Sequence, residues 1–91
     1  MKAITKEKLE EYFKITEKAF KIAEKSISKN KEKQAKEILL MVSCYLSDSK
    51  HFQKKGDFLN SFGSIYYAHG WLDCGARLKI FNVTDSSLFT I

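Results

Sequence analysis

Proline is absent from this chain of 91 residues, and only four positions are glycine. These two residues are the strongest local signals for turns and for the ends of helices. Turn signals are therefore few, which favours a small number of long elements joined by short loops. With 44% hydrophobic and 30% charged residues, the composition is that of an ordinary globular chain rather than a disordered one.

Cysteines and long apolar runs are also scarce. Cys44 and Cys74 lack CxxC spacing, which argues against a zinc site or a redox motif. Asp48 and His51 are too few ligands for a metal site, so we expect no metal and no cofactor. The longest apolar run, residues 38–42, is far shorter than the roughly 20 residues of a membrane span, and the N-terminus lacks the apolar segment of a signal peptide. These features predict a cytoplasmic protein without a membrane span.

The motifs of several enzyme classes are missing. The sequence contains no GxGxxG, GxxxxGK[ST], HExxH or GxSxG pattern. The glutamates from Glu7 to Glu37 fall on polar helix faces or at helix ends, so paired carboxylates for hydrolysis are not expected inside a helix. No residue is assigned a catalytic role, and nothing in the sequence requires an enzyme.

Apolar residues recur with the spacing of one helical face over three segments. The predicted organisation is a single domain, residues 1–91, with helices at about 5–29, 32–54 and 57–81 and a tail at 82–91. Thr5 and Asp57 can cap the first and third helices, and Gly56 can end the second in a left-handed conformation. The turn at Gly56 places Tyr45 near Tyr66. Short connections make neighbouring helices antiparallel, so we predict an all-α, antiparallel up-and-down three-helix bundle with the C-terminal tail packed back on it.

Positive charge is concentrated in residues 1–36, which contain 11 lysines and 6 glutamates. Four lysines recur along one side of the first predicted helix, opposite its apolar face. We call them the lysine stripe: Lys14, Lys18, Lys21 and Lys25. The stripe is typical either of a solvated face, partly neutralised by glutamates one turn away, or of a surface that binds nucleic acid or another polyanion. Base-specific recognition is not expected, because every basic residue except Arg77 is lysine.

Three ionisable residues, His69, Asp73 and Arg77, follow one another along one side of the third predicted helix. That side also carries large apolar residues, so we expect it to face inward. Buried charges must satisfy one another, which predicts a ladder in which Asp73 pairs with both His69 and Arg77. The alternative is a small-molecule or catalytic site, because a histidine oriented by a carboxylate can act as a general base.

Three glycines in the same helix, Gly63, Gly70 and Gly75, need an explanation, because each costs the helix roughly 1 kcal/mol relative to alanine. Close approach by the backbone of a neighbouring helix would explain them. We expect it in particular at Gly63 and Gly70, which are seven residues apart.

A second apolar strip on this helix consists of Tyr67, Trp71, Cys74 and Leu78. A monomer seldom leaves so much contiguous apolar surface in water. Leu88, Phe89 and Ile91 make the tail the expected cover, and a homodimer partner packed at Trp71 is the competing one. The oligomeric state stays open.

The most distinctive segment of the chain is Tyr67-Ala68-His69-Gly70-Trp71-Leu72-Asp73. With Gly56-Asp57 before it and Gly75, Arg77-Leu78 and Phe81 after it, this segment resembles the signature of a family of small archaeal helical proteins known only as domain of unknown function family 357. The resemblance extends over nearly the whole chain and implies a helical bundle. It implies no activity.

The sequence therefore favours a small cytoplasmic helical protein that acts as a protein-binding or scaffolding module, with another protein or a second copy of itself as partner. Two alternatives stay open. One is sequence-independent nucleic-acid binding through the lysine stripe, and the other is a small-molecule or catalytic site at His69, Asp73 and Arg77.

Overall fold

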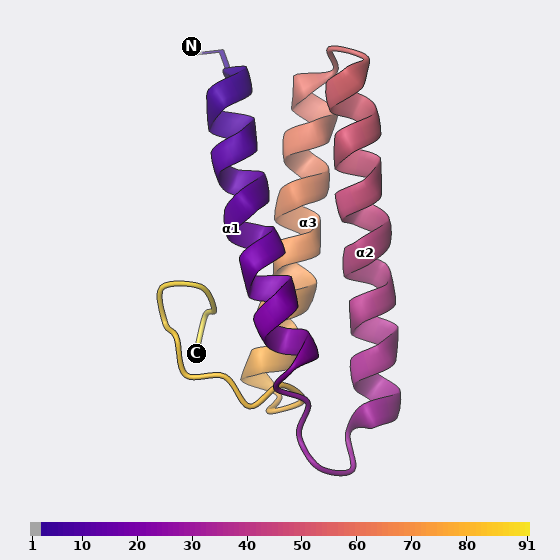
Figure 1. Ribbon diagram of the computed structural model, residues 1–91, viewed down its shortest axis with the longest axis vertical. Coiled ribbons are helices and arrows are strands. Elements are labelled where there is room, and N and C mark those ends of the chain that lie inside the picture. Colours follow the sequence, from indigo (N-terminus) through magenta and orange to yellow (C-terminus); the bar gives the residue numbers. More distant parts are fainter. Residues whose placement is uncertain (1–2) are drawn as a thin grey trace.

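The computed structural model describes residues 3–91, which form three helices and a C-terminal tail (Figure 1). The helices are α1 (Lys6–Glu24), α2 (Glu32–Lys54) and α3 (Phe58–Arg77). Consecutive helices run in opposite directions, and α3 packs against both of the others, most extensively against α2 (Figure 1). The prediction of an all-α, up-and-down three-helix bundle is confirmed.

The first turns of α1 and α3 are capped by the side chains that the sequence predicted. The Thr5 hydroxyl accepts a hydrogen bond from the backbone N–H of Lys8 at 3.1 Å. The Asp57 carboxylate accepts one from the backbone N–H of Asn60 at 3.2 Å. Each cap satisfies one of the amide groups that the start of a helix leaves without an intrahelical partner.

Gly56 ends α2 as predicted, with a positive φ of 77°. Its N–H donates to the carbonyl of Gln53, and the N–H of Asp57 donates to the carbonyl of Phe52 at 2.9 Å. This pair of bonds forms a Schellman motif, which closes the last turn of α2 and leads the chain directly into α3. The two helices consequently lie antiparallel and side by side (Figure 1).

The helices α1 and α3 are shorter than predicted. They end at Glu24 and Arg77 rather than near residues 29 and 81. Beyond α3, Lys79 adopts a left-handed φ of 61°, and the N–H of Ile80 donates to the Gly75 carbonyl at 2.9 Å. A lysine occupies the position where glycine is the usual signal, so the end of α3 has no local mark in the sequence.

The segments that follow α1 and α3 pair with each other at the base of the bundle. Ile27 and Phe81 form an isolated antiparallel bridge, and the N–H of Ser28 donates to the carbonyl of Ile80 at 2.9 Å. Serines beside a β-branched isoleucine disfavour helical backbone, which explains why α1 stops before them. The pairing closes this end of the bundle and buries Phe81 completely.

Small residues line the contact between α2 and α3. Ser61, Ala68 and Gly75 are seven residues apart and are all buried on one face of α3. The Ser61 hydroxyl donates to the Ser49 carbonyl of α2 at 2.8 Å, and the two hydroxyl oxygens lie 3.0 Å apart. Both serines are fully buried, so these bonds fix the register at which α3 lies against α2.

Gly63 and Gly70 do not have the role that we expected. Both face solvent, and a Cβ added at either position would meet no heavy atom within 4 Å. Close approach does occur at Gly75, but side chains make it rather than a helix backbone: an added Cβ would lie 2.5 Å from the Phe81 ring and 3.1 Å from the Ile38 side chain. The expectation was wrong because Gly63 and Gly70 lie on a side of α3 that no other helix of the chain covers.

The tail folds back on the bundle as predicted, beside α1 and on the side away from α2 (Figure 1). It turns at Asp85, whose backbone carbonyl accepts from the N–H groups of Leu88 and Phe89 at 3.1 Å. The hydroxyl and the N–H of Ser87 both donate to the Asp85 carboxylate, and these bonds lower the pKa of Asp85. Leu88 and Phe89 are buried, so the tail contributes to the core.

Replacing Gly75 with alanine should lower the free energy of unfolding by about 1–3 kcal/mol, because the added methyl group would overlap the buried Phe81 ring. The matched control is Gly70→Ala. In the single chain it should raise the free energy of unfolding by up to about 1 kcal/mol, since alanine is the better helix former and no atom of the described residues lies within 4 Å of the added Cβ. Urea denaturation of both variants checks the difference, and stabilisation by Gly75→Ala would contradict the close packing.

Candidate functional site

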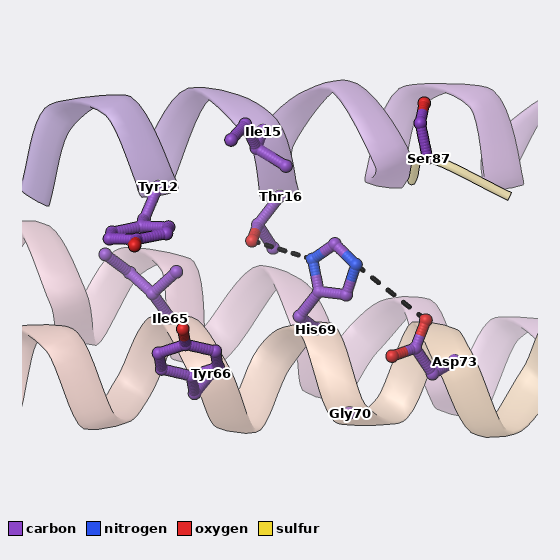
Figure 2. Close-up of a pocket in the computed structure, with 9 residues that line it drawn as sticks. All are labelled: Tyr12, Ile15, Thr16, Ile65, Tyr66, His69, Gly70, Asp73 and Ser87. Carbon is purple, nitrogen blue, oxygen red and sulfur yellow. Dashed lines mark hydrogen bonds and ion pairs between the residues drawn. The ribbon is translucent and has the colours of Figure 1, made fainter. Parts of the chain in front are cut away.

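His69 lies at the junction of α1, α3 and the tail. Its Nδ1 lies 2.9 Å from the Thr16 hydroxyl of α1, and its Nε2 lies 2.6 Å from the backbone carbonyl of Leu88 in the tail. Figure 2 shows the imidazole projecting from α3 toward α1, between Thr16 and Asp73. One side chain thus joins three segments that are far apart in the sequence.

The partners of His69 decide where its proton lies. A carbonyl oxygen can only accept, so Nε2 carries a hydrogen and donates to Leu88. In the neutral ring Nδ1 is then an acceptor, and the Thr16 hydroxyl donates to it. Both ring nitrogens are therefore engaged, and neither is free to take a proton from a substrate as a general base must.

Asp73 holds the tail one turn further along α3. One carboxylate oxygen accepts from the Thr90 N–H at 2.9 Å, and the other accepts from the Thr90 hydroxyl at 3.1 Å. The first of these oxygens also lies 3.8 Å from His69 Nε2, close enough for an ion pair when the ring is protonated. His69 and Asp73 together therefore bind two successive parts of the tail.

Arg77, the third residue of the predicted ladder, is not part of this arrangement. Its side chain is exposed, and within residues 3–91 it forms no ion pair with Asp73. The ladder is wrong at this position, because Asp73 accepts from Thr90 where Arg77 was expected. The tail supplies uncharged donors, so no second charge has to be brought into the cluster.

Two members of this cluster were missing from the prediction. Thr16 is 2% exposed, and a threonine on the buried face of a helix is a signal that its hydroxyl has a polar partner. Thr90 carried no such signal, because its contact with α3 depends on the path that the tail takes. The sequence therefore indicated the acceptor Asp73 and not its donor.

An open groove of about 380 Å³ continues from this cluster between α1 and α3. Tyr12 and Tyr66 stand on its two sides, with their ring centroids 5.9 Å apart (Figure 2). The polar side chains at its end, those of His69, Asp73 and Ser87, are already hydrogen-bonded within the chain. The groove has room for a small molecule, but both ring nitrogens of His69 already bind partners within the chain, Thr16 and the Leu88 carbonyl of the tail.

The outer face of α3 is the side that α1, α2 and the tail leave in contact with solvent. We define it by its nine exposed residues: Leu59, Asn60, Gly63, Tyr66, Tyr67, Gly70, Cys74, Arg77 and Leu78. Leu59 is 75% exposed, Leu78 is 63% exposed and Tyr67 is 54% exposed. Arg77 is the single charged residue on the outer face.

Most of the second apolar strip that the sequence predicted lies on this face. Tyr67, Cys74 and Leu78 are exposed, and Trp71 is half-buried at the edge. The expectation that the tail covers the strip is wrong, because the tail is bound by His69 and Asp73 on another side of α3. The strip is uncovered in the single chain. Cys44 and Cys74 are both free and exposed.

Tyr45 of α2 supports one edge of the outer face. Its ring lies edge-on to Tyr67, with centroids 4.5 Å apart. Partial burial raises the pKa of the Tyr45 phenol, and the neighbouring Tyr67 raises it further. The Tyr45 side chain therefore stays uncharged and extends the uncharged surface from α3 onto α2.

The lysine stripe is exposed along α1. Its four residues surround a shallow depression together with Glu17 and Ile22. Within residues 3–91 none of the four ammonium groups forms an ion pair with a carboxylate. Lys18 nevertheless lies close enough to Asp85 of the tail to help lower the pKa of that carboxyl, after the larger effect of the bonds from Ser87.

None of the helices in the described part of the chain combines the length and the apolarity that crossing a membrane requires. The same residues contain no group of three His, Cys, Asp or Glu side chains placed to hold a metal ion. Asp48 and His51 are both exposed on α2.

Comparison with known protein families matches residues 11–81 to the family described as "Protein of unknown function (DUF357)". The chain belongs to this family. The matched region contains the outer face of α3, the lysine stripe and the contact between His69 and Thr16, whereas Leu88 and Thr90 lie beyond it. Comparisons with curated proteins and with solved structures gave no match.

Replacing Asp73 with alanine should release the end of the tail, because Thr90 loses the acceptor of both its hydrogen bonds. We expect the free energy of unfolding to fall by about 1–2 kcal/mol, less than the loss of one partner of a buried ion pair would cost. The Thr90 amide should lose its protection against hydrogen exchange, measured by NMR. Asp48→Ala, which removes an exposed carboxylate from α2, should change neither quantity. A Thr90 amide that stays protected in Asp73→Ala would contradict the anchoring.

Proposed function

We propose that this protein is a protein-binding module and that the outer face of α3 is its binding surface. The observation that carries the proposal is the composition of this face, which is exposed along the whole helix and has Arg77 as its single charge. The exposed side of α1, in contrast, is made almost wholly of lysine and glutamate. A helix face whose only neighbour is water is expected to resemble that side of α1.

The shape of the outer face suits an α-helix of another polypeptide. Gly63 and Gly70 leave open space above the α3 backbone, and the exposed tyrosines Tyr66 and Tyr67 stand beside them. A partner helix can approach the backbone at the glycines while the tyrosine and leucine side chains contact its flanks. Tyrosine suits this position because it offers a large apolar ring and a hydroxyl group that can stay hydrated at the rim.

The two glycines support the same proposal on energetic grounds. Each costs α3 roughly 1 kcal/mol relative to alanine. Within the single chain this cost has no compensation, since an alanine Cβ would fit at both positions without touching a neighbour. A close approach by a second polypeptide supplies the compensation that the fold itself does not.

We also place the protein in the cytoplasm. This location is supported by the free, exposed thiols of Cys44 and Cys74, which a reducing compartment maintains.

An aromatic photo-crosslinking amino acid in place of Tyr66, an exposed residue of the outer face, tests the binding surface in the protein's native cells. We expect covalent adducts with protein from this position, and none from the matched control position Lys21 in the lysine stripe. Adding Tyr67→Glu and Leu78→Glu, at positions that are more than half exposed, should abolish the adducts because they place charge on the face. Adducts that survive these substitutions, or that form equally at Lys21, would contradict the proposal.

A second candidate is sequence-independent nucleic-acid binding through the lysine stripe. It is favoured by one observation, that the four ammonium groups are exposed and form no ion pair within residues 3–91. Lysine contacts phosphate as a point charge, which suits binding to a nucleic-acid backbone rather than to base edges.

Fluorescence anisotropy with mixed-sequence duplex DNA tests this candidate. If the stripe binds DNA, the logarithm of the association constant should fall linearly with the logarithm of the salt concentration, by about 0.9 per phosphate neutralised. Lys18→Gln with Lys21→Gln should reduce that slope by about two units, whereas Lys54→Gln with Lys55→Gln, at the other end of the bundle, should not. Absence of binding at low salt, or equal losses in both double variants, would eliminate the stripe as the binding surface.

A further inference from the structure

We propose that the polypeptide bound by the outer face of α3 is a second copy of this chain. The two α3 helices run antiparallel and are related by a two-fold axis that passes between them, level with the midpoint of Tyr66 and Tyr67. This inference rests on the proposed function and names its ligand. The assembly is a pair of three-helix bundles joined through α3.

The centre of the outer face has the same order of residues in both directions. Moving away from the axis, the first pair is Tyr66 and Tyr67, and the next exposed pair is Gly63 and Gly70, at equal separations on the two sides. In a two-fold interface residue i of one copy faces residue j of the other, and j faces i. In this order each glycine faces a glycine, so the two positions without side chains coincide on both sides of the axis.

The antiparallel arrangement brings the open positions of the two copies together. Gly63 of one copy lies opposite Gly70 of the other, and the same contact recurs on the other side of the axis. The two α3 backbones can approach closely there, because a single chain places no side chain above either glycine. On the two flanks of this contact, Tyr66 meets its own counterpart and Tyr67 meets its own.

Charge favours the antiparallel direction over the parallel one. A parallel pair would place the two Arg77 guanidinium groups side by side, whereas an antiparallel pair separates them by about 30 Å at 1.5 Å per residue. Charge also favours α3 over α1 as the meeting surface. The chain has a net charge of +5, and two copies that met through their lysine stripes would repel each other.

Disulfide trapping reports both the interface and its direction. The proposed axis places Asn60 of one copy near Cys74 of the other, while the two Cys74 residues lie roughly 20 Å apart along the helices. In a Cys44→Ser background, Asn60→Cys should therefore give a disulfide-linked dimer on mild oxidation with copper phenanthroline, and peptide mapping should join positions 60 and 74. The Cys44→Ser protein itself, which keeps Cys74, should remain unlinked.

Sedimentation of the purified chain gives a second, independent measurement. Gly70→Arg should raise the dissociation constant of the dimer by at least about tenfold, because it inserts a bulky charge where the two backbones meet. Ser47→Arg, at an exposed position of α2, should leave it unchanged. Circular dichroism should show that both variants are folded, because both substitutions are at solvent-facing positions.

The outcomes separate this inference from the proposed function. A wild-type chain that sediments as a monomer, or a disulfide that joins two Cys74 residues, overturns the antiparallel dimer. If the purified chain is a monomer but position 66 still forms adducts with a different protein in cells, the outer face binds another partner and only the second copy is wrong. If position 66 also forms no adducts, both proposals fall.

Discussion

The contact between α2 and α3 determines which side of α3 is buried and which side faces the solvent. It is made by small residues, and the buried bonds between Ser49 and Ser61 hold the two helices at one register. Ser61, Ala68 and Gly75 are buried in this contact, and the large side chains of Ile65 and Leu72 are buried with them. Tyr67 and Leu78 lie on other sides of the helix and are 54% and 63% exposed. With one side of α3 used for this contact, the opposite side stays in contact with solvent unless another segment covers it.

The tail shows why a polar contact can decide an arrangement that apolar burial leaves open. Burial of Leu88 and Phe89 stabilises the fold, but the hydrophobic effect has no direction and does not by itself select one groove over another. Hydrogen bonds have strict geometry, and those to His69 and Asp73 are satisfied in one place only. They position the tail between α1 and α3. The outer face is left open for the same reason.

The parts of the fold that could be predicted from the sequence are those with local signals, such as turn and cap residues. Gly56 and Asp57 indicated the turn between α2 and α3, and this turn also set the register of the two helices. Tyr45 was expected near Tyr66 and in fact contacts Tyr67, one residue away. The end of α1 had a local signal in Ser26, Ile27 and Ser28, which the predicted helix wrongly included. The end of α3 had none, since Lys79 takes the left-handed position and the chain beyond it pairs with a segment that is distant in the sequence.

The candidate site was predictable to the extent that its geometry is helical. Periodicity placed His69 and Asp73 together, but the donors to Asp73 come from a tail that has no period. The expectation for the glycines came from a general rule, that a glycine within a helix indicates the close approach of another backbone. At Gly75 something does come close, but it is the side chains of Phe81 and Ile38 rather than a backbone. At Gly63 and Gly70 no heavy atom of the described residues lies within 4 Å of an added Cβ, because the bundle has no fourth helix on that side. This open space is the basis of our proposal that another polypeptide approaches there.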